Sequence, residues 1–550
     1  MATASAQFRS ITDEYYRTWF RFHPEAAVDV GVWGYEHLLT PFVPDDLGPL
    51  VCLNDQLIIS LEELDRDALS ADERIDYDLL HGAALLENEY VLDLAPRAPD
   101  PGRLLPVNAI YQLTIRSVPG VAAALTARLA AIPYHLQRAI DYLRPQLKRV
   151  PLPWADSALA GAREGVGYFH ALAHELPRQQ RSAGFEPALR GAEQALGRFA
   201  DFLQTELCPQ ASGDIACGAA RFERLLRHRH FFDVTPDQLR AFGASLCETV
   251  QHELADAACA LTGGDADVPA ALARVRQRYP AAGDLLSVYR NEMQAARAFV
   301  QQRGLVSMPE REQLSVVETP PFLRNQIPFA AYMEPAALDA AQHGYYYVTP
   351  PAGPEQLAEH DIAGIRHTCV HEAWPGHHLQ FVRAHLAVHS RSLPRLLNPS
   401  ATLYEGWALY CEQLMAEQGF LAGPEHRFIL LRDRLWRALR VVIDVDIHTH
   451  RRSVAEATEL LVERLGFTPV QALAELTWYS RAPTVPMSYA AGWAMINGLR
   501  DAVVDDTSGP SLRAFHDRLL SAGSVGLPRV VAHAFGEERW REVRRTLLAE

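Results

Sequence analysis

Helical periodicity, interrupted by proline and glycine, is the feature that most constrains the fold of this chain. Segments rich in Ala, Leu, Arg, Glu and Gln fill most of the sequence, as in residues 184–207 and 235–264. In the second segment, apolar residues recur every three or four positions and form one stripe along a helix. Such stripes are typical of helices that pack on a core, and we expect helices over most of the chain.

The composition excludes several classes of protein. Of the 550 residues, 48% are hydrophobic and 22% are charged, which is typical of a globular protein and excludes long disordered regions. Asp and Glu number 67 against 52 for Lys and Arg, so the formal net charge is −15. This acidic balance argues against binding to nucleic acid or an anionic membrane through bulk charge. We therefore expect neither as a partner.

The cysteines and the N-terminus suggest a compartment. The seven cysteines are scattered without a CxxC pair, so the sequence predicts neither a disulfide framework nor a cysteine zinc site. The first twenty residues lack the apolar core of a signal peptide. No apolar run reaches the length of about 18 residues that a membrane helix needs. From these features we expect a reducing cytoplasmic location.

Two proline-containing stretches lack helical periodicity. Residues 94–118 are rich in proline and arginine and are expected to form a long surface connection. Residues 318–352 combine proline with aromatic residues, and within them residues 345–348 give the clearest strand signal of the chain. A free edge of this strand could pair with an extended substrate. The alternative is a buried hairpin that only braces the neighbouring helix.

The segment HTCVHEAWPGHHLQF, residues 367–381, carries the chemistry. Its His371-Glu372 pair followed by His377-His378 resembles an HExxH zinc helix with altered spacing. In an HExxH helix, two histidines about 6 Å apart on one face bind the same zinc ion. In this longer motif, a regular helix would point the second histidine away or place it too far along the axis.

Proline and glycine between the histidines resolve this conflict. Pro375 has no N–H, and its ring clashes with the carbonyl of His371 in a regular helix. Gly376 permits unusual backbone angles. We therefore predict that residues 373–376 break the helix and let the flanking histidines converge on one metal.

A third metal ligand is expected in LYEGWALYCEQL, residues 403–414. Glu405 lies there among apolar residues, where a carboxylate is costly to bury unless it is paired or bound to a metal. Glu412 follows seven residues later on the same helical face. It either supports one of the ligands or is an ordinary solvated charge.

The sequence thus predicts one Zn²⁺ bound by His371, His377 and Glu405. His378 is the alternative to His377, which we favour because it follows glycine, as the second ligand does in GH-containing HExxH helices. Glu372, beside the first ligand, is the expected general base for a water whose pKa the metal lowers to about 7.

These motifs resemble the bacterial family called domain of unknown function 885, whose members look like zinc metallopeptidases. HEAWPGHHLQ and EGWALYCE match its two signatures, and the likeness covers nearly the whole chain. More distantly, the chain is similar to thimet oligopeptidase and carboxypeptidase Taq. The resemblance implies a mostly α fold in which two helical halves flank a deep cleft, with a small β-sheet beside the zinc helix. We expect an N-terminal half over residues 1–305 and a catalytic half over residues 306–550, interleaved as one unit.

Three further residues are candidates for catalysis or substrate binding. Tyr489 could donate a hydrogen bond to a tetrahedral oxyanion, as tyrosines do in similar peptidases, or could simply pack within a helix. Arg440 and His448 could bind a substrate carboxylate or carbonyl. Because Arg440, Asp444 and His448 follow one another at steps of four on a helical face, they could equally satisfy one another.

The leading hypothesis is a cytoplasmic zinc hydrolase that cleaves an amide in a small peptide or peptide-like substrate. One alternative is a biosynthetic zinc enzyme that forms or rearranges an acyl or amide bond. It is motivated by Val445-Asp446, where the family usually has Thr-Gly. Another is a non-catalytic, metal-stabilised binding protein, which is disfavoured because it would not need Glu372. The sequence leaves open the substrate, the end of a peptide that is attacked, and the oligomeric state.

Overall fold

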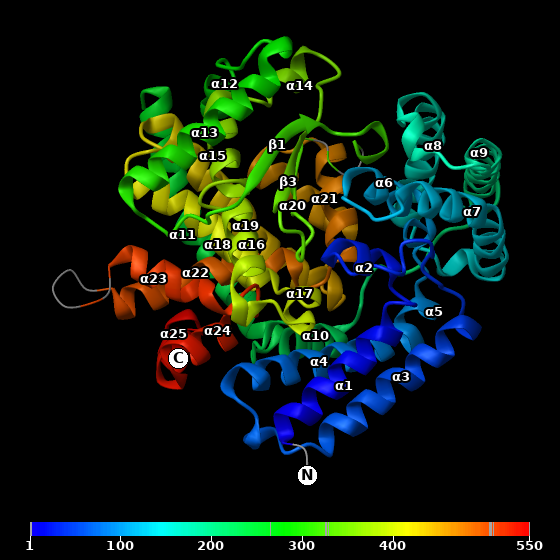
Figure 1. Ribbon diagram of the computed structural model, residues 1–550. Helices are drawn as coiled ribbons and strands as arrows, with labels where there is room; N and C mark the ends of the chain where they lie inside the picture. Colours follow the sequence, from blue (N-terminus) through cyan, green and yellow to red (C-terminus); the bar gives the residue numbers. More distant parts are fainter. Residues whose placement is uncertain are drawn as a thin grey trace. The chain divides into compact units, whose positions relative to one another are not determined.

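The computed structural model describes residues 3–264, 266–324, 327, 329–504, 509 and 511–548. Within these residues the protein is mostly α-helical, with one three-stranded sheet (Figure 1). The mostly α fold with a small sheet is therefore confirmed. The deep cleft between two helical halves stays a prediction.

The chain forms two compact units that alternate along the sequence. The first comprises Met1–Ile215, Thr319–Pro328 and Ala336–Ala340, and the second comprises Ala216–Glu318, Phe329–Pro335 and Ala341–Glu550. The main division thus follows residue 215, whereas we expected it after residue 305. The reason lies in the helices between these positions, which pack against later helices of the second unit.

The first unit is helical. Its α-helices are α1 (Ala4–Trp19), α2 (Pro24–Val30), α3 (Pro44–Glu62), α4 (Ala71–Glu89), α5 (Ala95–Arg97), α6 (Val107–Ile115), α7 (Val121–Leu143), α8 (Leu152–Glu175) and α9 (Phe185–Phe202).

Helix α6 corrects the prediction for residues 94–118, which we expected to form a long surface connection. The apolar residues Val107, Ile110 and Leu113 of α6 are buried, and the helix packs against α7. The helix is only two to three turns long, and so brief an apolar run between prolines gives little periodicity to detect.

The second unit holds the sheet and all the candidate site residues. Its strands are β1 (Gln313–Glu318), β2 (Ala330–Met333) and β3 (His343–Val348). Its α-helices are α10 (Ala219–His230), α11 (Pro236–Thr262), α12 (Val268–Val275), α13 (Leu285–Arg303), α14 (Pro354–Ala358), α15 (Ile362–Glu372), α16 (His377–Leu386), α17 (Leu393–Leu397), α18 (Ala401–Glu417), α19 (Pro424–His448), α20 (Val454–Leu465), α21 (Pro469–Arg481), α22 (Val485–Val503), α23 (Leu512–Leu519), α24 (Leu527–Phe535) and α25 (Glu537–Leu548).

Strand β3 lies in the middle of the sheet. It pairs in parallel with β1 and antiparallel with β2. The predicted strand at residues 345–348 is confirmed, but the prediction that its edge pairs with substrate is wrong, because both edges are already paired. Tyr346 and Tyr347 point to opposite faces of the sheet and are both buried. Tyr346 packs against Tyr289 of α13, which in turn contacts α15. The strand therefore braces the helix that carries the motif.

Five helices of the second unit carry the candidate site residues. Helix α18 packs against α15, α16, α19 and α22, and α19 packs against α15 and α22 (Figure 1). Nearly every residue of α18 from Ala401 to Met415 is buried. Charged residues on such a helix need partners, and their partners define the site.

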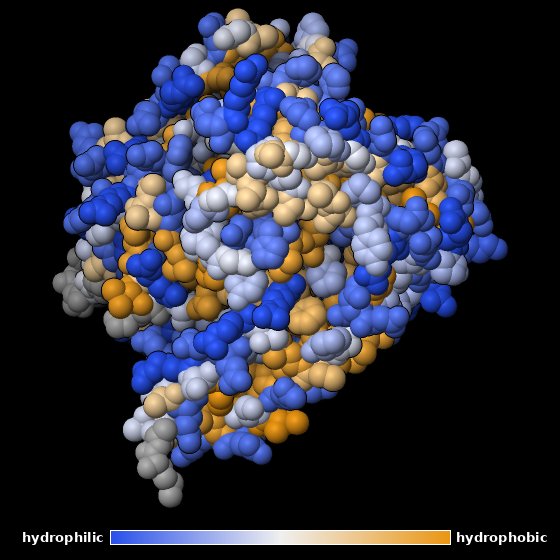
Figure 2. Space-filling model, turned by 45° about the vertical axis from the view of Figure 1, so that its right-hand side comes forward, coloured by the Kyte–Doolittle hydropathy of each residue, from blue (hydrophilic) through white to orange (hydrophobic). Residues whose placement is uncertain are grey.

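The surface is mixed in polarity. On the face shown in Figure 2, hydrophilic residues cover most of the area, with hydrophobic residues exposed between them. Among the described residues, no helix combines the length and the apolar character that crossing a bilayer requires.

Candidate metal centre

The break in the motif lies where the sequence predicts it. Helix α15 ends at Glu372 and α16 begins at His377. Between them, Ala373 has φ −113° and ψ −86°, which leaves the helical region. The Gly376 N–H donates to the carbonyl of Val370, 3.1 Å away. A Cβ at Gly376 would overlap the carbonyl oxygen of His371, so only glycine fits this close approach.

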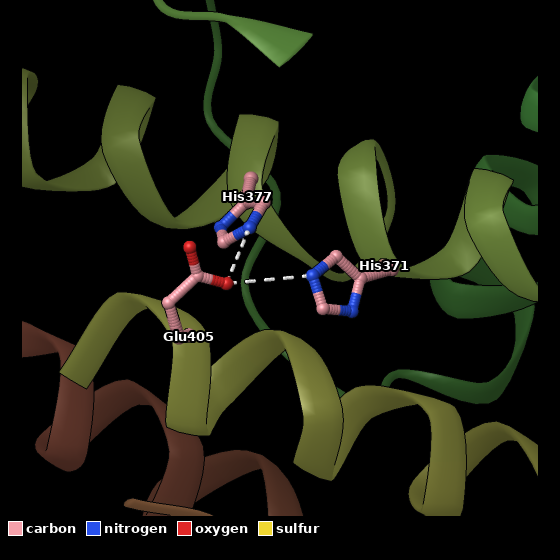
Figure 3. Close-up of side chains that lie close together, drawn as sticks. All are labelled: His371, His377 and Glu405. Atoms are coloured by element: carbon pink, nitrogen blue, oxygen red, sulfur yellow. Dashed lines mark ion pairs between the residues drawn. The ribbon is translucent and has the colours of Figure 1, made fainter. Parts of the chain in front are cut away.

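The break brings three potential ligands together. The Nε2 atoms of His371 and His377 lie 3.5 Å and 3.2 Å from the same oxygen, Oε2 of Glu405 (Figure 3). One ligand atom from each residue can be chosen so that all lie within 4.8 Å of one another. All three residues are buried, and Glu405 Oε2 has no hydrogen-bond partner among the described residues. This donor set, two imidazoles and one carboxylate, fits a zinc ion with an open fourth position.

A tight helix crossing positions Glu405. Gly406 on α18 meets Gly492 on α22 so closely that a Cβ on Gly406 would lie 2.6 Å from Gly492 Cα. The backbones of α18 and α22 can approach only because both residues are glycine. Tyr489, one turn before Gly492, is thereby brought close to the neighbouring Glu405.

Glu412 contacts the ring nitrogen of His371 that faces away from Glu405. Its Oε1 accepts a hydrogen bond of 2.7 Å from Nδ1 of His371. Burial raises the pKa of Glu412, but contacts with His367 and His371 lower it more, so the pKa falls below its usual range. Burial likewise opposes a charge on His371, yet its contacts with the carboxylates of Glu405 and Glu412 raise its pKa to about 10. The two carboxylates thus fix the ring and direct Nε2 toward the other ligands.

His378 faces away from this cluster. Its Nε2 donates to Glu312, 2.7 Å away, and its Nδ1 lies 3.1 Å from the hydroxyl of Tyr332. Arg297 holds the other oxygen of Glu312 at 2.8 Å. The sequence analysis missed Glu312 and Tyr332, because no motif marks them. Glu312 directly precedes β1 and Tyr332 lies on β2, so the fold of the sheet brings both to His378. The structure brings His377, rather than His378, to His371 and Glu405.

Glu372 lies beside the cluster without belonging to it. It is the last residue of α15, directly after His371. Burial raises its pKa, and the neighbouring His377 and His371 only partly oppose this effect. A buried glutamate next to a metal site is placed to accept a proton and to return it.

Tyr489 lies against the other face of the centre. Its ring is nearly parallel to that of His371, with centroids 6.3 Å apart. Burial and the charge of Glu405 raise the pKa of Tyr489 well above its usual value. Its hydroxyl therefore keeps its proton and remains a hydrogen-bond donor.

Arg440 is occupied within the protein. It bonds the hydroxyl of Tyr479 and Glu475, each at 3.0 Å, and its guanidinium lies 4.5 Å from the ring centroid of Tyr489. These two partners lie on α21. Helical spacing had indicated Asp444 as the partner instead. Arg440 therefore supports Tyr489, and its role toward substrate stays a prediction.

His448 is also occupied. The backbone N–H of Cys217 donates to its Nδ1 at 3.3 Å, so Nε2 carries the proton toward the carbonyl of Tyr479 at 3.2 Å. Its side chain is fully buried, with Asp444 at 3.6 Å. The structure does not bring His448 to the three potential ligands.

The unusual Val445-Asp446 pair lies in the core. Val445 is fully buried, and Asp446 forms ion pairs with Arg240 at 2.6 Å and Arg452 at 3.3 Å. The extra carboxylate is therefore neutralised by these arginines. It gives no reason to assign a biosynthetic reaction.

The chain matches one family over most of its length. Residues 24–533 match the family described as bacterial protein of unknown function (DUF885). Among curated proteins, none matches.

Solved structures share the fold. One, from Shewanella oneidensis, is 19% identical with a TM-score of 0.74, covering 95% of this chain and 98% of that chain. Another, from Colwellia psychrerythraea, is 16% identical with a TM-score of 0.80 and full coverage of both chains. Both proteins are provisionally described as lipoproteins, the first of unknown function. An M32 carboxypeptidase from Deinococcus radiodurans R1 is 12% identical over 99% of this chain and all of its own, but its TM-score of 0.41 carries no argument.

These relatives correct the expected location. A lipoprotein is exported and attached to a membrane by its lipid, so two relatives of this description contradict a cytoplasmic assignment. That assignment depended on scattered cysteines, on first residues without an apolar signal core and on the lack of long apolar runs in the sequence. None of these features excludes an exported protein.

Proposed function

The chain belongs to the bacterial family DUF885, and for this member we propose the function of a zinc-dependent hydrolase that cleaves an amide bond in a small peptide or peptide-like molecule. The observation that carries the proposal is the convergence of His371, His377 and Glu405 around one point, with Glu372 adjacent and outside the ligand set. Glu372 distinguishes an enzyme from a binding protein, because holding the metal does not require it.

The residues around the centre divide the chemistry between them. A metal held by the three ligands would polarise the amide carbonyl and make water more acidic. Glu372 would accept a proton from the attacking water and pass it to the leaving nitrogen. Tyr489, which keeps its proton, would donate a hydrogen bond to the carbonyl oxygen as negative charge develops there.

The description of the solved relatives supports an exported location for this hydrolase. A small peptide-like substrate would then be met outside the cytoplasm. Fractionation of cells that express the natural gene would test this part of the proposal.

Separating metal binding from turnover tests the proposal. Glu372→Gln should retain about one zinc per chain and lose about 10²–10⁴-fold in turnover of short peptides, since it removes only the general base. Glu405→Ala, the matched control, should lose zinc and turnover together. Zinc is measured by elemental analysis and turnover by release of free amine. Near-normal turnover in Glu372→Gln would rule out the hydrolytic mechanism.

A further inference from the structure

Three aromatic rings lie beside His377, one of the potential metal ligands. The ring centroids of Phe381 and Tyr404 are 6.0 Å and 6.1 Å from that of His377. The ring of Tyr332 is nearly parallel to that of His377, with centroids 6.4 Å apart. Phe381 also contacts the two tyrosines, at 6.2 Å and 5.6 Å, so the three rings form one aromatic row. They come from β2, α16 and α18, and only the fold brings them together.

The aromatic row is not part of the closed core. Tyr332, Phe381 and Tyr404 are each only half-buried. His377 is buried, and Trp407, the next aromatic residue of α18 after Tyr404, is fully buried. Ligand sites are lined mainly by apolar and aromatic side chains around a few polar groups. Half-buried rings in contact with a buried metal ligand offer such a lining, on which a bound substrate can place an apolar group beside the metal.

The ring of Tyr332 is fixed before any ligand binds. Its hydroxyl lies 3.1 Å from Nδ1 of His378, and Nε2 of that histidine donates to Glu312. A Cβ at Gly344 of β3 would lie 3.0 Å from a ring carbon of Tyr332 and 3.1 Å from Nδ1 of His378. The lack of a side chain at Gly344 therefore makes room for both rings. A ring held in this way loses little conformational freedom when a ligand packs on it, which favours binding.

We propose that the row of Tyr332, Phe381 and Tyr404 is a subsite for an aromatic side chain next to the amide bond that is cleaved. This inference rests on the proposed function and adds the substrate class, short peptides or peptide-like amides with an aromatic group beside the scissile bond. Aromatic rings pack on one another at centroid distances of about 4.5–7 Å, the spacing already present within the row. A cationic side chain also binds aromatic faces, but the positive charge of a metal at His377 opposes it.

A binding experiment tests the subsite without using turnover. The probes are the N-acetyl amides of phenylalanine, leucine, alanine and lysine, none of which carries a metal-binding group. Their affinity for zinc-loaded Glu372→Gln protein is measured by ligand-observed NMR titration. The phenylalanine probe should bind about tenfold more tightly than the alanine probe, because its ring packs on the aromatic row. The leucine and lysine probes should bind less tightly than the phenylalanine probe.

Two variants remove one ring each from the row. Phe381→Leu keeps an apolar side chain but loses the central ring, so the preference for phenylalanine over leucine should disappear. Tyr404→Leu should reduce this preference, and it provides the measurement if the first variant fails to fold. Zinc content and the thermal midpoint show that a variant keeps its metal and its fold. The matched control is Tyr279→Leu, which removes an exposed ring without ring contacts in the described part of the chain and should preserve the preference.

Other outcomes overturn the inference. The subsite is excluded if the phenylalanine probe binds no more tightly than any one of the other three, or if none of them binds. A preference for phenylalanine that survives the loss of either ring of the row also excludes it. Hydrolysis of peptides by the native protein at rates independent of the neighbouring side chains would refute the subsite and retain the hydrolase. An aromatic preference in binding with no amine released from any peptide would refute the hydrolase alone.

Discussion

Two carboxylates of one helix act on opposite sides of a single imidazole. Glu405 and Glu412 lie seven residues apart on α18, which is close to two helical turns. Glu405 faces Nε2 of His371 at 3.5 Å, and Glu412 accepts from Nδ1 at 2.7 Å. Oε2 of Glu405 is available to a metal. Oε1 of Glu412 accepts the proton of Nδ1 and so fixes the tautomer of His371 in which Nε2 is free to bind the metal.

Replacing the outer carboxylate should weaken metal binding without removing a ligand. Glu412→Gln keeps the shape and the hydrogen bond to His371 but loses the negative charge. We expect zinc affinity to fall about 10–100-fold, measured by competition with a chelator. Glu417→Gln is the matched control, since Glu417 lies on the same helix and pairs with Arg500. Equal zinc affinity of Glu412→Gln and the native protein would show that the charge of Glu412 beside His371 does not affect zinc binding.

The sequence predicts those residues whose chemistry is local. His371, His377 and Glu405 are marked by residue type and spacing, because a helix fixes which side chains can meet. Glu312 and Tyr332, the partners of His378, carry no such mark. Their positions depend on how the sheet packs against the motif, which spacing along the chain does not encode.

At the scale of elements, proline and glycine predict the break between α15 and α16, and a run of tyrosines predicts strand β3. The sequence does not predict the strands that pair with β3. Val316 and Val317 are the only β-branched residues of strands β1 and β2, and β1 pairs not with the next strand of the chain but with β3. Missing these two strands made β3 seem to have a free edge, and the expected pairing with substrate failed for that reason.

Adding one methyl group at the break should disturb the whole centre. In Gly376→Ala the Cβ would overlap the carbonyl of His371, so α16 must shift and carry His377 away from Glu405. We expect loss of zinc by elemental analysis and a lower thermal midpoint. Gly498→Ala, on α22 with only ordinary contacts to Val543, should be neutral or stabilising by up to about 1 kcal/mol. Full zinc content in the Gly376 variant would show that the break tolerates a side chain.

At the scale of the molecule, buried neutral histidines link stability to pH. Burial lowers the pKa values of His360 and His516 to about 4 and that of His230 well below its usual value. An unfolded chain protonates these residues near pH 6.5. Stability should therefore fall as the pH decreases from about 6.5 to 4, by about 1.4 kcal/mol per pH unit for each such histidine.

A variant of one histidine tests this linkage. His516 bonds the carbonyl of Leu305 at 2.7 Å and the hydroxyl of Tyr410 at 2.9 Å, and glutamine can replace both bonds without titrating. Between pH 7 and 5, His516→Gln should lose about 2 kcal/mol less unfolding free energy than the native protein, measured with urea. Parallel pH profiles for the two proteins would exclude His516 as a source of the effect.

The alternation of the two units along the chain bears on how the protein is made. A chain leaves a ribosome or a translocation channel from one end to the other. The first unit ends its long segment at Ile215 but also includes Thr319–Pro328 and Ala336–Ala340. The first unit therefore cannot complete its fold until residue 340 has emerged. By then β1 and β2 of the second unit have emerged as well. Neither unit can finish before the other has begun, so a nascent chain stopped between residues 215 and 340 should need protection from aggregation.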